Sequence, residues 1–416
     1  MNLTITCLKL FELYYSSPFI SHTNFFPHSQ HLISKSIFSH SFKSAFYSNS
    51  NNIDLRLTNS KFTHFLSSSI RINGFEMNNE VRHRTSTFRH PFVNISHCEF
   101  SFCNSESNGG AIDFSIQGSK FYVQDSIFHT NEASSNGGGF YFIGLGFSLK
   151  RLCFISCKCK LFGQAYFIQG EADLPDELND SLLFNCAPEP FIRCSFGTYN
   201  QKGAANYHYN NYSFNQCVRG GSAITTSLCD SKFVTYSLFC NNTGGRLIDF
   251  QFCQVRIDIF RCNFIGNVAT MLTVIGFSYM TYVTECFFQA NSIPIALPGG
   301  GREHSIIFAK CVSDKLGITD QNGIAIHDGH DLMALETTVI IPRRYKNPCV
   351  HIDNDGKGNI EDINWFYIIG ISILVILSHL IIIQTHLFIS IYRSLFFDTR
   401  ETKRKRIKRA PRIRLE

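Results

Sequence analysis

The chain has 416 residues, of which 44% are hydrophobic, and a formal net charge of +6. Its 41 Phe against one Trp, with only 17% charged residues, favour a repetitive apolar interior over the single core of an ordinary globular enzyme. The positive charge lies at the end of the chain: residues 393–416 hold ten Lys/Arg and three Asp/Glu, which leaves 28 basic and 29 acidic groups before them. Residues 1–392 are therefore almost neutral, and their charge gives no reason to expect nucleic-acid binding.

The N-terminal region, residues 1–55, precedes the clear repeats. Its opening stretch, MNLTITCLKLFELYYSSPFI, is partly apolar, but Lys9 and Glu12 interrupt it. A normal secretory signal has an uninterrupted apolar region. We therefore interpret residues 1–55 either as an atypical signal or as the first coil of the repeat.

The body of the chain, residues 56–345, contains a repeat of 24 to 30 residues anchored on Phe. Short apolar runs such as KFYVQ and GFYFIG alternate with Gly, Asn and Ser, which is typical of short strands joined by turns. About three strands per period predict an all-β fold, a right-handed parallel β-helix. The anchors, expected to stack inside as one aromatic column, are Phe100, Phe128, Phe154, Phe184, Phe214, Phe239, Phe264 and Phe288.

Two further positions recur in these cells. Asn follows the anchor by three residues, where we expect it to stack at a turn that tolerates left-handed geometry. Gly-Gly pairs come later in the cell, where a sharp bend needs no Cβ. The Asn positions are Asn131, Asn242, Asn267 and Asn291, and the Gly pairs are Gly109 with Gly110, Gly137 with Gly138, and those at 220–221 and 244–245.

The alternation of these motifs resembles the repeats of polymorphic membrane proteins (Pmp-type repeats). GGAI at 109–112 and GGGF at 137–140 represent the first motif, and Phe-x-x-Asn at 128–131, 239–242, 264–267 and 288–291 represents the second. The resemblance covers about residues 95–295 and implies a surface-displayed, adhesin-like or antigen-like protein. With one helix and a basic tail after the repeats, the chain resembles the single-pass surface proteins of trichomonads. No residue-level binding site transfers with the resemblance.

Fourteen of the 16 cysteines lie between residues 98 and 311. Cys262 and Cys286 stand at the same offset from their anchors, which predicts stacked positions in neighbouring coils. Stacked cysteines can form disulfides in an oxidising exterior, or they can serve as small buried apolar residues. Both interpretations stay open. The spacing of Cys153, Cys157 and Cys159 matches no standard zinc site.

Four sequons fall in the predicted ectodomain, at Asn94, Asn179, Asn211 and Asn241. An Asn-x-Ser/Thr sequon is a glycosylation acceptor in a secreted domain. These four residues are therefore candidate glycosylation sites of a glycoprotein.

An enzyme is the main alternative, because β-helices include polysaccharide lyases and hydrolases. Their sites bring several carboxylates together with a basic partner. The repeat carboxylates occur singly, and the nearest approach to a cluster is Asp249 and Asp258 with Arg246 and Arg256. HDGHD at 327–331 is interpreted as a polar turn and DNDGKGNI at 353–360 as linker. We predict no enzymatic activity, metal or cofactor.

A transmembrane helix is predicted at residues 365–392, which contain no Asp, Glu, Lys or Arg. Residues 346–364 form the juxtamembrane linker, and the basic residues 393–416 mark a cytoplasmic tail. Anionic inner-leaflet lipids are its expected partner. The expected contacts are Lys403, Arg404, Lys405, Arg406, Lys408 and Arg409.

Together these features predict a single-pass plasma-membrane protein with its N-terminus outside and a β-helix ectodomain. The expected function is adhesin-like or antigen-like binding to a host-cell, matrix or glycan ligand, by a disulfide-containing glycoprotein. The alternatives are a membrane-anchored polysaccharide lyase or hydrolase and a structural surface-coat protein.

Overall fold

The structure is a computed structural model that describes residues 2–11, 17–22, 29–74, 91–170, 175–186, 196–202, 204–228, 233–253, 255–276, 280–292, 305–313, 324–327, 332–334 and 349. These residues form an all-β parallel solenoid, a right-handed β-helix, within the compact unit Met1–Cys349. Among them no helix has the length and apolarity needed to cross a bilayer. The span predicted at 365–392 and the tail at 393–416 lie outside the described residues, as does the linker apart from Cys349.

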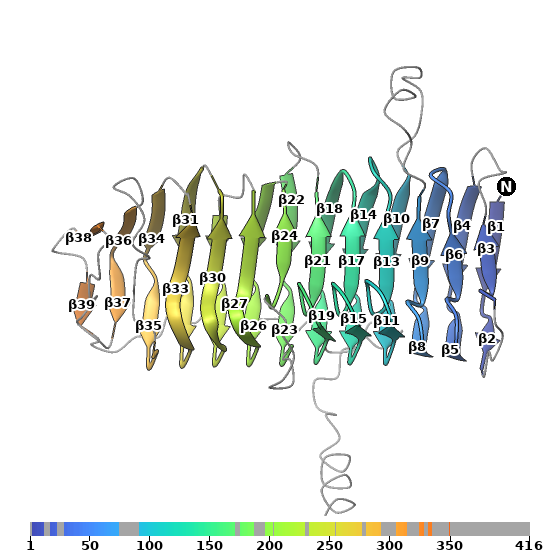
Figure 1. The fold of residues 1–416 in the computed structure, drawn as a ribbon, viewed down its shortest axis with the longest axis horizontal. Coiled ribbons are helices and arrows are strands. Elements are labelled where there is room, and N and C mark those ends of the chain that lie inside the picture. The colour runs from blue at the N-terminus through green and yellow to red at the C-terminus, as the bar shows by residue number, and fades with distance from the viewer. Residues whose placement is uncertain are drawn as a thin grey trace, which may run out of the picture. The chain divides into compact units, whose positions relative to one another are not determined.

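Three long sheets run along the solenoid, and every strand pairs in parallel with its equivalents in the neighbouring coils (Figure 1). The first sheet contains β1 (Asn2–Thr6), β4 (Ser29–Ser34), β7 (Ile53–Thr58), β10 (Phe92–Ser96), β14 (Lys120–Gln124), β18 (Gly146–Lys150), β22 (Pro175–Asn179), β25 (Ala204–His208), β28 (Phe233–Thr235), β31 (Arg256–Phe260), β34 (Met280–Thr284), β36 (Ser305–Ala309) and β38 (Ile324–His327).

The second sheet follows the first in each coil. It contains β2 (Lys9–Leu10), β5 (Ile37–Ser41), β8 (Lys61–Phe65), β11 (Glu99–Ser101), β15 (Ile127–His129), β19 (Cys153–Ile155), β23 (Leu182–Phe184), β26 (Asn211–Ser213), β29 (Leu238–Cys240), β32 (Asn263–Ile265), β35 (Phe287–Gln289), β37 (Cys311–Ser313) and β39 (Leu332–Ala334).

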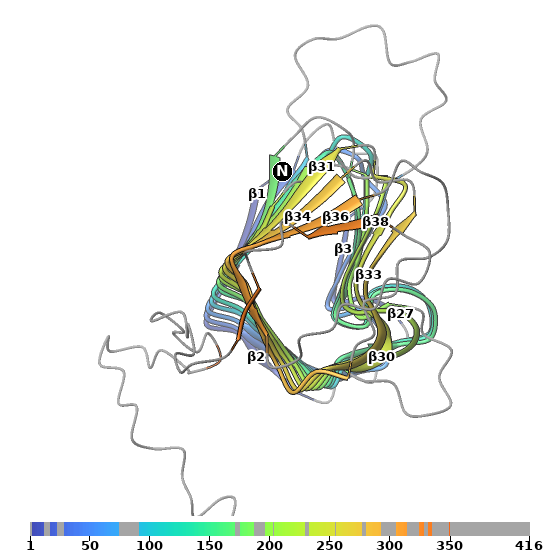
Figure 2. The same ribbon diagram turned by 90° about the vertical axis from the view of Figure 1, so that its left-hand side faces the viewer.

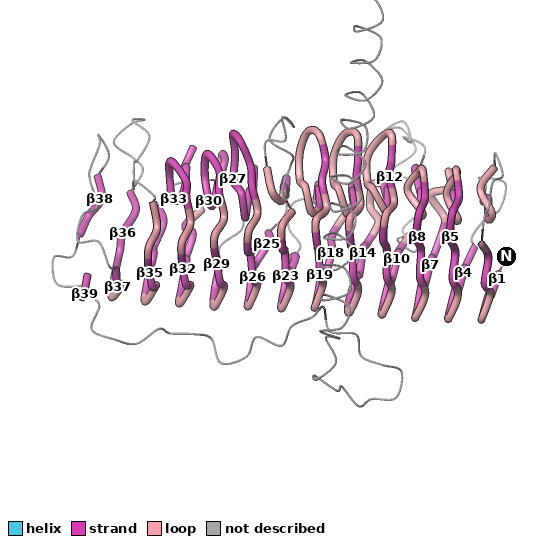
Figure 3. Tube along the Cα trace, turned by 90° about the horizontal axis from the view of Figure 1, so that it is seen from below, coloured by secondary structure: helices cyan, strands magenta, loops and turns pink. Residues whose placement is uncertain are grey.

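The third sheet closes the coil. It contains β3 (Ile20–His22), β6 (Phe46–Ser48), β9 (Ile70–Asn73), β13 (Ile112–Ser115), β17 (Phe140–Ile143), β21 (Tyr166–Gln169), β24 (Tyr199–Gln201), β27 (Gln216–Ser227), β30 (Thr243–Gln251) and β33 (Val268–Gly276). A small fourth sheet contains β12 (Asn104–Ser105), β16 (Glu132–Ala133) and β20 (Lys158–Cys159). Seen along the axis, the coils are three-sided, with a lobe beside the third sheet at β27 and β30 (Figures 2 and 3).

The corner between the first and second sheets is here called the first corner. In each coil it consists of one residue whose backbone has the left-handed conformation, with a positive φ. Its backbone N–H donates to the next coil, as Arg151 N does to Asn179 O over 2.9 Å and Tyr209 N to Thr235 O over 3.0 Å. A left-handed L-residue costs roughly 1–2 kcal/mol, and this continuous ladder of hydrogen bonds offsets the cost. The members are Cys7, Lys35, Asn59, His97, Asp125, Arg151, Asp180, Tyr209, Tyr236, Arg261, Glu285 and Lys310.

A column of large side chains fills the interior behind the second sheet. Four successive ring pairs before Leu183 and three after it stack at centroid distances of 4.8–5.1 Å and interplanar angles of 4–12°. Each buried ring contributes roughly 1.5–3 kcal/mol by removal of its surface from water. The members are Phe38, Phe62, Phe100, Phe128, Phe154, Leu183, Tyr212, Phe239, Phe264 and Phe288.

The prediction that Phe184 and Phe214 belong to this column is wrong. Leu183 and Tyr212 occupy the interior register, so Phe184 falls one residue later, on the outer face, and Phe214 two residues later, at a corner. The two Phe side chains are 38% and 46% exposed, and their rings meet edge to face at 5.5 Å. In these two coils the residue type predicts the wrong position, because strand pairing sets the register.

The solenoid begins earlier than the predicted boundary at residue 56. β1 pairs with β4 over five residues and β4 with β7 over six, and β7 spans the boundary itself. The described part of residues 1–55 therefore has the structure of coils, which agrees with the first-coil interpretation of this region.

Candidate ligand-binding face

One outward-facing line of residues crosses six consecutive strands of the third sheet. Strand pairing places these residues side by side, one from each of β6, β9, β13, β17, β21 and β24. At roughly 4.8 Å per strand the line is about 24 Å long. We call it the outer column; its members are Tyr47, Arg71, Asp113, Tyr141, Phe167 and Tyr199.

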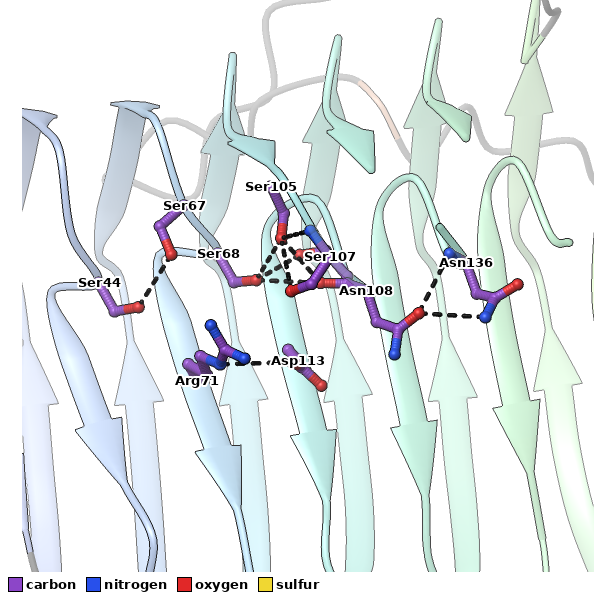
Figure 4. Close-up of polar contacts among 10 residues, drawn as sticks. Ser44, Ser67, Ser68, Arg71, Ser105, Ser107, Asn108, Asp113 and Asn136 are labelled. Carbon is purple, nitrogen blue, oxygen red and sulfur yellow. Dashed lines mark hydrogen bonds and ion pairs between the residues drawn. The ribbon is translucent and has the colours of Figure 1, made fainter. Parts of the chain in front are cut away.

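A charged pair lies near the middle of the outer column (Figure 4). Arg71 Nε is 3.6 Å from Asp113 Oδ2, and the Asp113 side chain is 5% exposed. Burial raises the pKa of Asp113 to about 6, although the Arg71 charge acts in the opposite direction. Burial and then the Asp113 charge raise the pKa of the neighbouring Tyr141 to about 12.

Aromatic rings occupy the next three positions of the outer column. Tyr141 stacks on Phe167 at 4.9 Å, and Phe167 on Tyr199 at 5.2 Å. Phe162 and Phe196, which are joined by an isolated β-bridge, extend this stack by contacts of 5.5 and 5.0 Å with Tyr199. Phe162 is 37% exposed and Phe196 and Tyr199 are half-buried, so the cluster presents apolar surface to solvent.

Polar side chains of the turns lie beside the charged pair (Figure 4). Ser68 Oγ donates to the carbonyl of Gly109 over 2.6 Å, and Ser105 Oγ donates to the carbonyl of Asn108 over 3.0 Å. Asn136 Nδ2 donates to Asn108 Oδ1 in the preceding coil over 3.1 Å. These bonds hold the turns of successive coils in register next to the outer column.

The structure places the motif Asn residues in a buried column inside the corner that follows the second-sheet strands. Asn242 Oδ1 accepts from the backbone N–H of Asn215 over 3.0 Å, and Asn242 Nδ2 donates to the Tyr212 carbonyl over 2.8 Å. Asn131, Asn267 and Asn291 make the equivalent bonds to a backbone carbonyl. The expectation of left-handed Asn at these positions is wrong, because the residue before each Asn has the positive φ: Thr130, Asn241, Gly266 and Ala290.

The first two Gly pairs lie at a sharp bend before the third sheet. Gly109 and Gly137 have φ of +61° and +69°, and a Cβ on Gly110 would lie 2.0 Å from the Gly138 carbonyl oxygen. The pairs at 220–221 and 244–245 lie within β27 and β30, whose pairing has register shifts on both sides of Gly221. A Cβ on Gly221 would lie 2.5 Å from the Ile224 carbonyl oxygen, the same three-residue relation that Gly109 has to Ile112.

The sequon residues differ in exposure. Asn94 on β10 and Asn241 at a corner are exposed, whereas Asn179 and Asn211 are half-buried. Glycosylation at these four residues stays a prediction. The basic residues 403–409 lie outside the described part of the chain.

The carboxylates considered for an enzymatic site are not brought together. Asp249 lies on the third sheet with Arg246 at 2.7 Å, and Asp258 on the first sheet with Arg256 at 2.7 Å. Asp113 shares the third sheet with Asp249 but is five strands away, about 24 Å. Acid–base pairs of glycosidases are about 5–10 Å apart. Asp125 forms an ion pair with Arg151, and Asp230 is outside the described residues.

Cys262 and Cys286 are buried thiols in neighbouring coils. The backbone N–H of Cys262 donates to Cys286 Sγ over 3.4 Å, which is the role that a Ser Oγ has in other coils. The interpretation as small buried residues therefore holds for this pair. Between cysteines that the structure describes, Cys153 and Cys349 form a disulfide. The described residues contain no group of three or more His, Cys, Asp or Glu placed to hold a metal ion.

The sequence analysis did not predict the outer column, although three of its residues share a position relative to a glycine. Asp113, Tyr141 and Phe167 each stand four residues after the left-handed glycine of their coil, Gly109, Gly137 or Gly163. Alignment on Gly rather than on Phe reveals this shared position.

The comparisons with known proteins returned nothing: no family model, curated protein or solved structure matches the chain.

Proposed function

We propose that the protein is a surface-displayed, adhesin-like binding protein whose solenoid stands outside the cell. The observation that carries the proposal is the half-exposed aromatic cluster of Phe162, Phe196 and Tyr199 on a rigid hydrogen-bonded sheet. Aromatic residues on a fixed scaffold provide large contact area at little loss of conformational entropy. The ligand class is a host-cell or matrix surface molecule, either a protein or a glycan.

The proposed membrane anchor is the uncharged segment 365–392, with the basic tail in the cytoplasm. Its length supports one crossing of the hydrocarbon core. Epitope tags at the tail and on an exposed corner test this topology: on unpermeabilised cells the corner tag is expected to be stained and the tail tag protected. Staining of the tail tag alone would overturn the topology.

Contact of the tail with anionic inner-leaflet lipids is part of the proposal. Dense Lys/Arg next to a membrane span is attracted to that leaflet by about 1 kcal/mol per residue near the surface. A synthetic peptide of residues 393–416 is expected to bind vesicles containing phosphatidylserine but not neutral vesicles. Equal binding to both kinds of vesicle would contradict this part of the proposal.

Binding is tested with the full-length chain in nanodiscs, applied to target cells and to matrix and glycan arrays. Saturable binding is expected, and Tyr199→Ala with Phe162→Ala is expected to weaken it about 30-fold, since loss of an aromatic contact costs roughly 2 kcal/mol. Tyr209→Ala is the control, because Tyr209 is 43% exposed on the first corner, away from the cluster. Absence of saturable binding to any surface would reject the adhesin and favour a structural surface coat.

A further inference from the structure

Two tyrosine side chains lie side by side on the first corner, in neighbouring coils. The rings of Tyr209 and Tyr236 stack at a centroid distance of 5.0 Å and an interplanar angle of 11°. Both residues have the left-handed corner conformation, with φ of +57° and +50°. The backbone N–H of Tyr209 also donates to the carbonyl of Thr235 in the next coil over 3.0 Å. The corner geometry therefore brings two phenols together and holds them in register.

The pair can be reached from solvent. Tyr209 is 43% exposed and Tyr236 is half-buried. The ring of Phe260, from the following coil, meets Tyr236 edge to face at 5.7 Å. Because Tyr209 and Tyr236 stand at the surface, a small tilt of one ring towards the other displaces no side chain of the core.

Other aromatic stacks of the solenoid differ from this pair in their chemistry. Tyr141 stacks on Phe167 at 4.9 Å, and Tyr212 stacks on Phe239 at 5.1 Å. Each of these two contacts contains a single phenol. The contact between Tyr209 and Tyr236 contains two, so both of its rings can be oxidised.

A phenol that loses one electron and its proton becomes a phenoxyl radical, whose unpaired electron is shared with the ring carbons next to the oxygen-bearing carbon. Two such radicals in contact couple through one of these carbons each. A C–C bond forms, the hydrogen atom on each coupled carbon moves to the phenoxyl oxygen, and both phenols are restored. The net loss is two electrons and two protons, which reduce one hydrogen peroxide to two waters.

We propose that Tyr209 and Tyr236 form an oxidative cross-linking site, at which hydrogen peroxide and a one-electron oxidant of the peroxidase class join the two rings as dityrosine. The fixed proximity of the rings makes their coupling an intramolecular step, which is strongly favoured over coupling between separate molecules. The inference does not depend on the proposed function or on the membrane anchor.

The consequence of the bond is a covalent link between two coils. It closes a loop from residue 209 to residue 236, at an edge where backbone hydrogen bonds otherwise connect the coils. A cross-link lowers the entropy of the unfolded chain, so the joined protein resists unfolding more than the protein with free tyrosines.

Treatment of the full-length chain in detergent with a haem peroxidase and hydrogen peroxide, followed by peptide mass spectrometry, tests the proposal. The expected product is a linked peptide pair that contains residues 209 and 236 and is lighter by two hydrogen atoms than the separate peptides. Its yield is expected to be independent of protein concentration. Absence of this pair, whether Tyr209 stays unmodified or carries other oxidation products, would overturn the proposal, as would links formed only between chains.

Tyr236→Phe is the decisive variant, because it removes one phenol and keeps a ring that can stack as Phe239 does on Tyr212. It is expected to abolish the linked pair and to lower the denaturation midpoint after oxidation relative to the oxidised unmodified protein. Tyr122→Phe is the matched control: Tyr122 is 38% exposed, and its register neighbours are Asn94 and Ser148. The control is expected to keep the full yield, and an equal loss in both variants would contradict the assignment to Tyr236.

Discussion

Asn242 Nδ2 donates to Asn267 Oδ1 in the next coil over 3.0 Å, and that same oxygen accepts the backbone N–H of Asn242, also over 3.0 Å. Asn267 repeats both bonds to Asn291. Each side-chain oxygen thus satisfies a backbone N–H of the corner, and each Nδ2 adds a bond to the carbonyl of a strand residue. Since Asn242 and Asn267 are fully buried, no water replaces these bonds.

Replacement of Asn267 by Ala is expected to lower the free energy of unfolding by about 2–4 kcal/mol, because it leaves the Asn242 N–H buried without this acceptor and removes the bond to the Phe239 carbonyl. Chemical denaturation and amide hydrogen exchange of β29 and β32 measure the loss. The control is Asn94→Ala, at an exposed position on β10. An unchanged denaturation midpoint in Asn267→Ala would contradict a structural role for the column.

Exchanging Gly and Ala at left-handed positions is expected to change the stability of the fold, with Gly137→Ala lowering it and Ala290→Gly raising it. Gly137→Ala should destabilise strongly, because the new Cβ would lie 2.1 Å from the Phe140 carbonyl oxygen at a φ of +69°. Ala290→Gly should stabilise by roughly 0.5–1 kcal/mol, since Ala290 already has a φ of +52°. Thermal denaturation of the two variants compares them. Equal shifts of the same sign would contradict the left-handed assignment.

Acid is expected to loosen the first coils through His31. Both ring nitrogens of His31 are buried without hydrogen-bond partners, and its ring lies 5.4 Å from that of His22. Burial first, and then the charge of His22, lower the pKa of His31 from 6.5 to about 4. The unfolded chain therefore takes up the proton first, and this stability is present above pH 6.5 and is lost as the pH falls towards 4.

Amide hydrogen exchange of β4 and β7 between pH 7 and pH 4, corrected for intrinsic rates, measures the effect. His31→Leu, which matches the register neighbours Leu3 and Leu55, is expected to remove most of the pH dependence. His97→Leu, at an exposed ring on the first corner, is the control. Identical pH profiles for His31→Leu and the unmodified protein would assign the effect to other groups.

The stacked cysteines are expected to be unreactive. Burial raises the pKa of Cys286 well above its usual value, and its side chain is 1% exposed. Alkylation of the native protein should modify Cys7 and leave Cys262 and Cys286 untouched. Cys286→Ser should be tolerated, because Ser237 accepts the same type of backbone hydrogen bond from Asn210. A disulfide between Cys262 and Cys286 in the purified protein would contradict this assignment.

The sequence predicts the β-solenoid because one residue type, Phe, recurs at the same position in most of its repeats. Phe100, Phe128 and Phe154 stand in successive coils at one register, and strand pairing keeps them there. The same reasoning failed where a coil uses Leu183 or Tyr212 in that register and places a Phe nearby on the surface. The sequence shows the residue types, whereas the register depends on backbone pairing with the neighbouring coil.

The candidate binding face was harder to predict for a related reason. Tyr47, Arg71 and Asp113 share no residue type, and only their position relative to the third-sheet strands makes them neighbours. Likewise Phe162 meets the half-exposed Phe196 and Tyr199 of the next coil through an isolated β-bridge between Phe162 and Phe196. Contacts of this kind arise from how one coil is placed on the next.

The first corner has a consequence for sequence variation. Its geometry is fixed by backbone hydrogen bonds between coils, and its twelve positions hold Cys, Lys, Asn, His, Asp, Arg, Tyr and Glu with the same left-handed conformation. Side chains at these positions can therefore be exchanged while the coil geometry is kept. On the surface-displayed protein proposed above, the surface that an antibody meets at this edge could then change while the hydrogen bonds underneath stay the same.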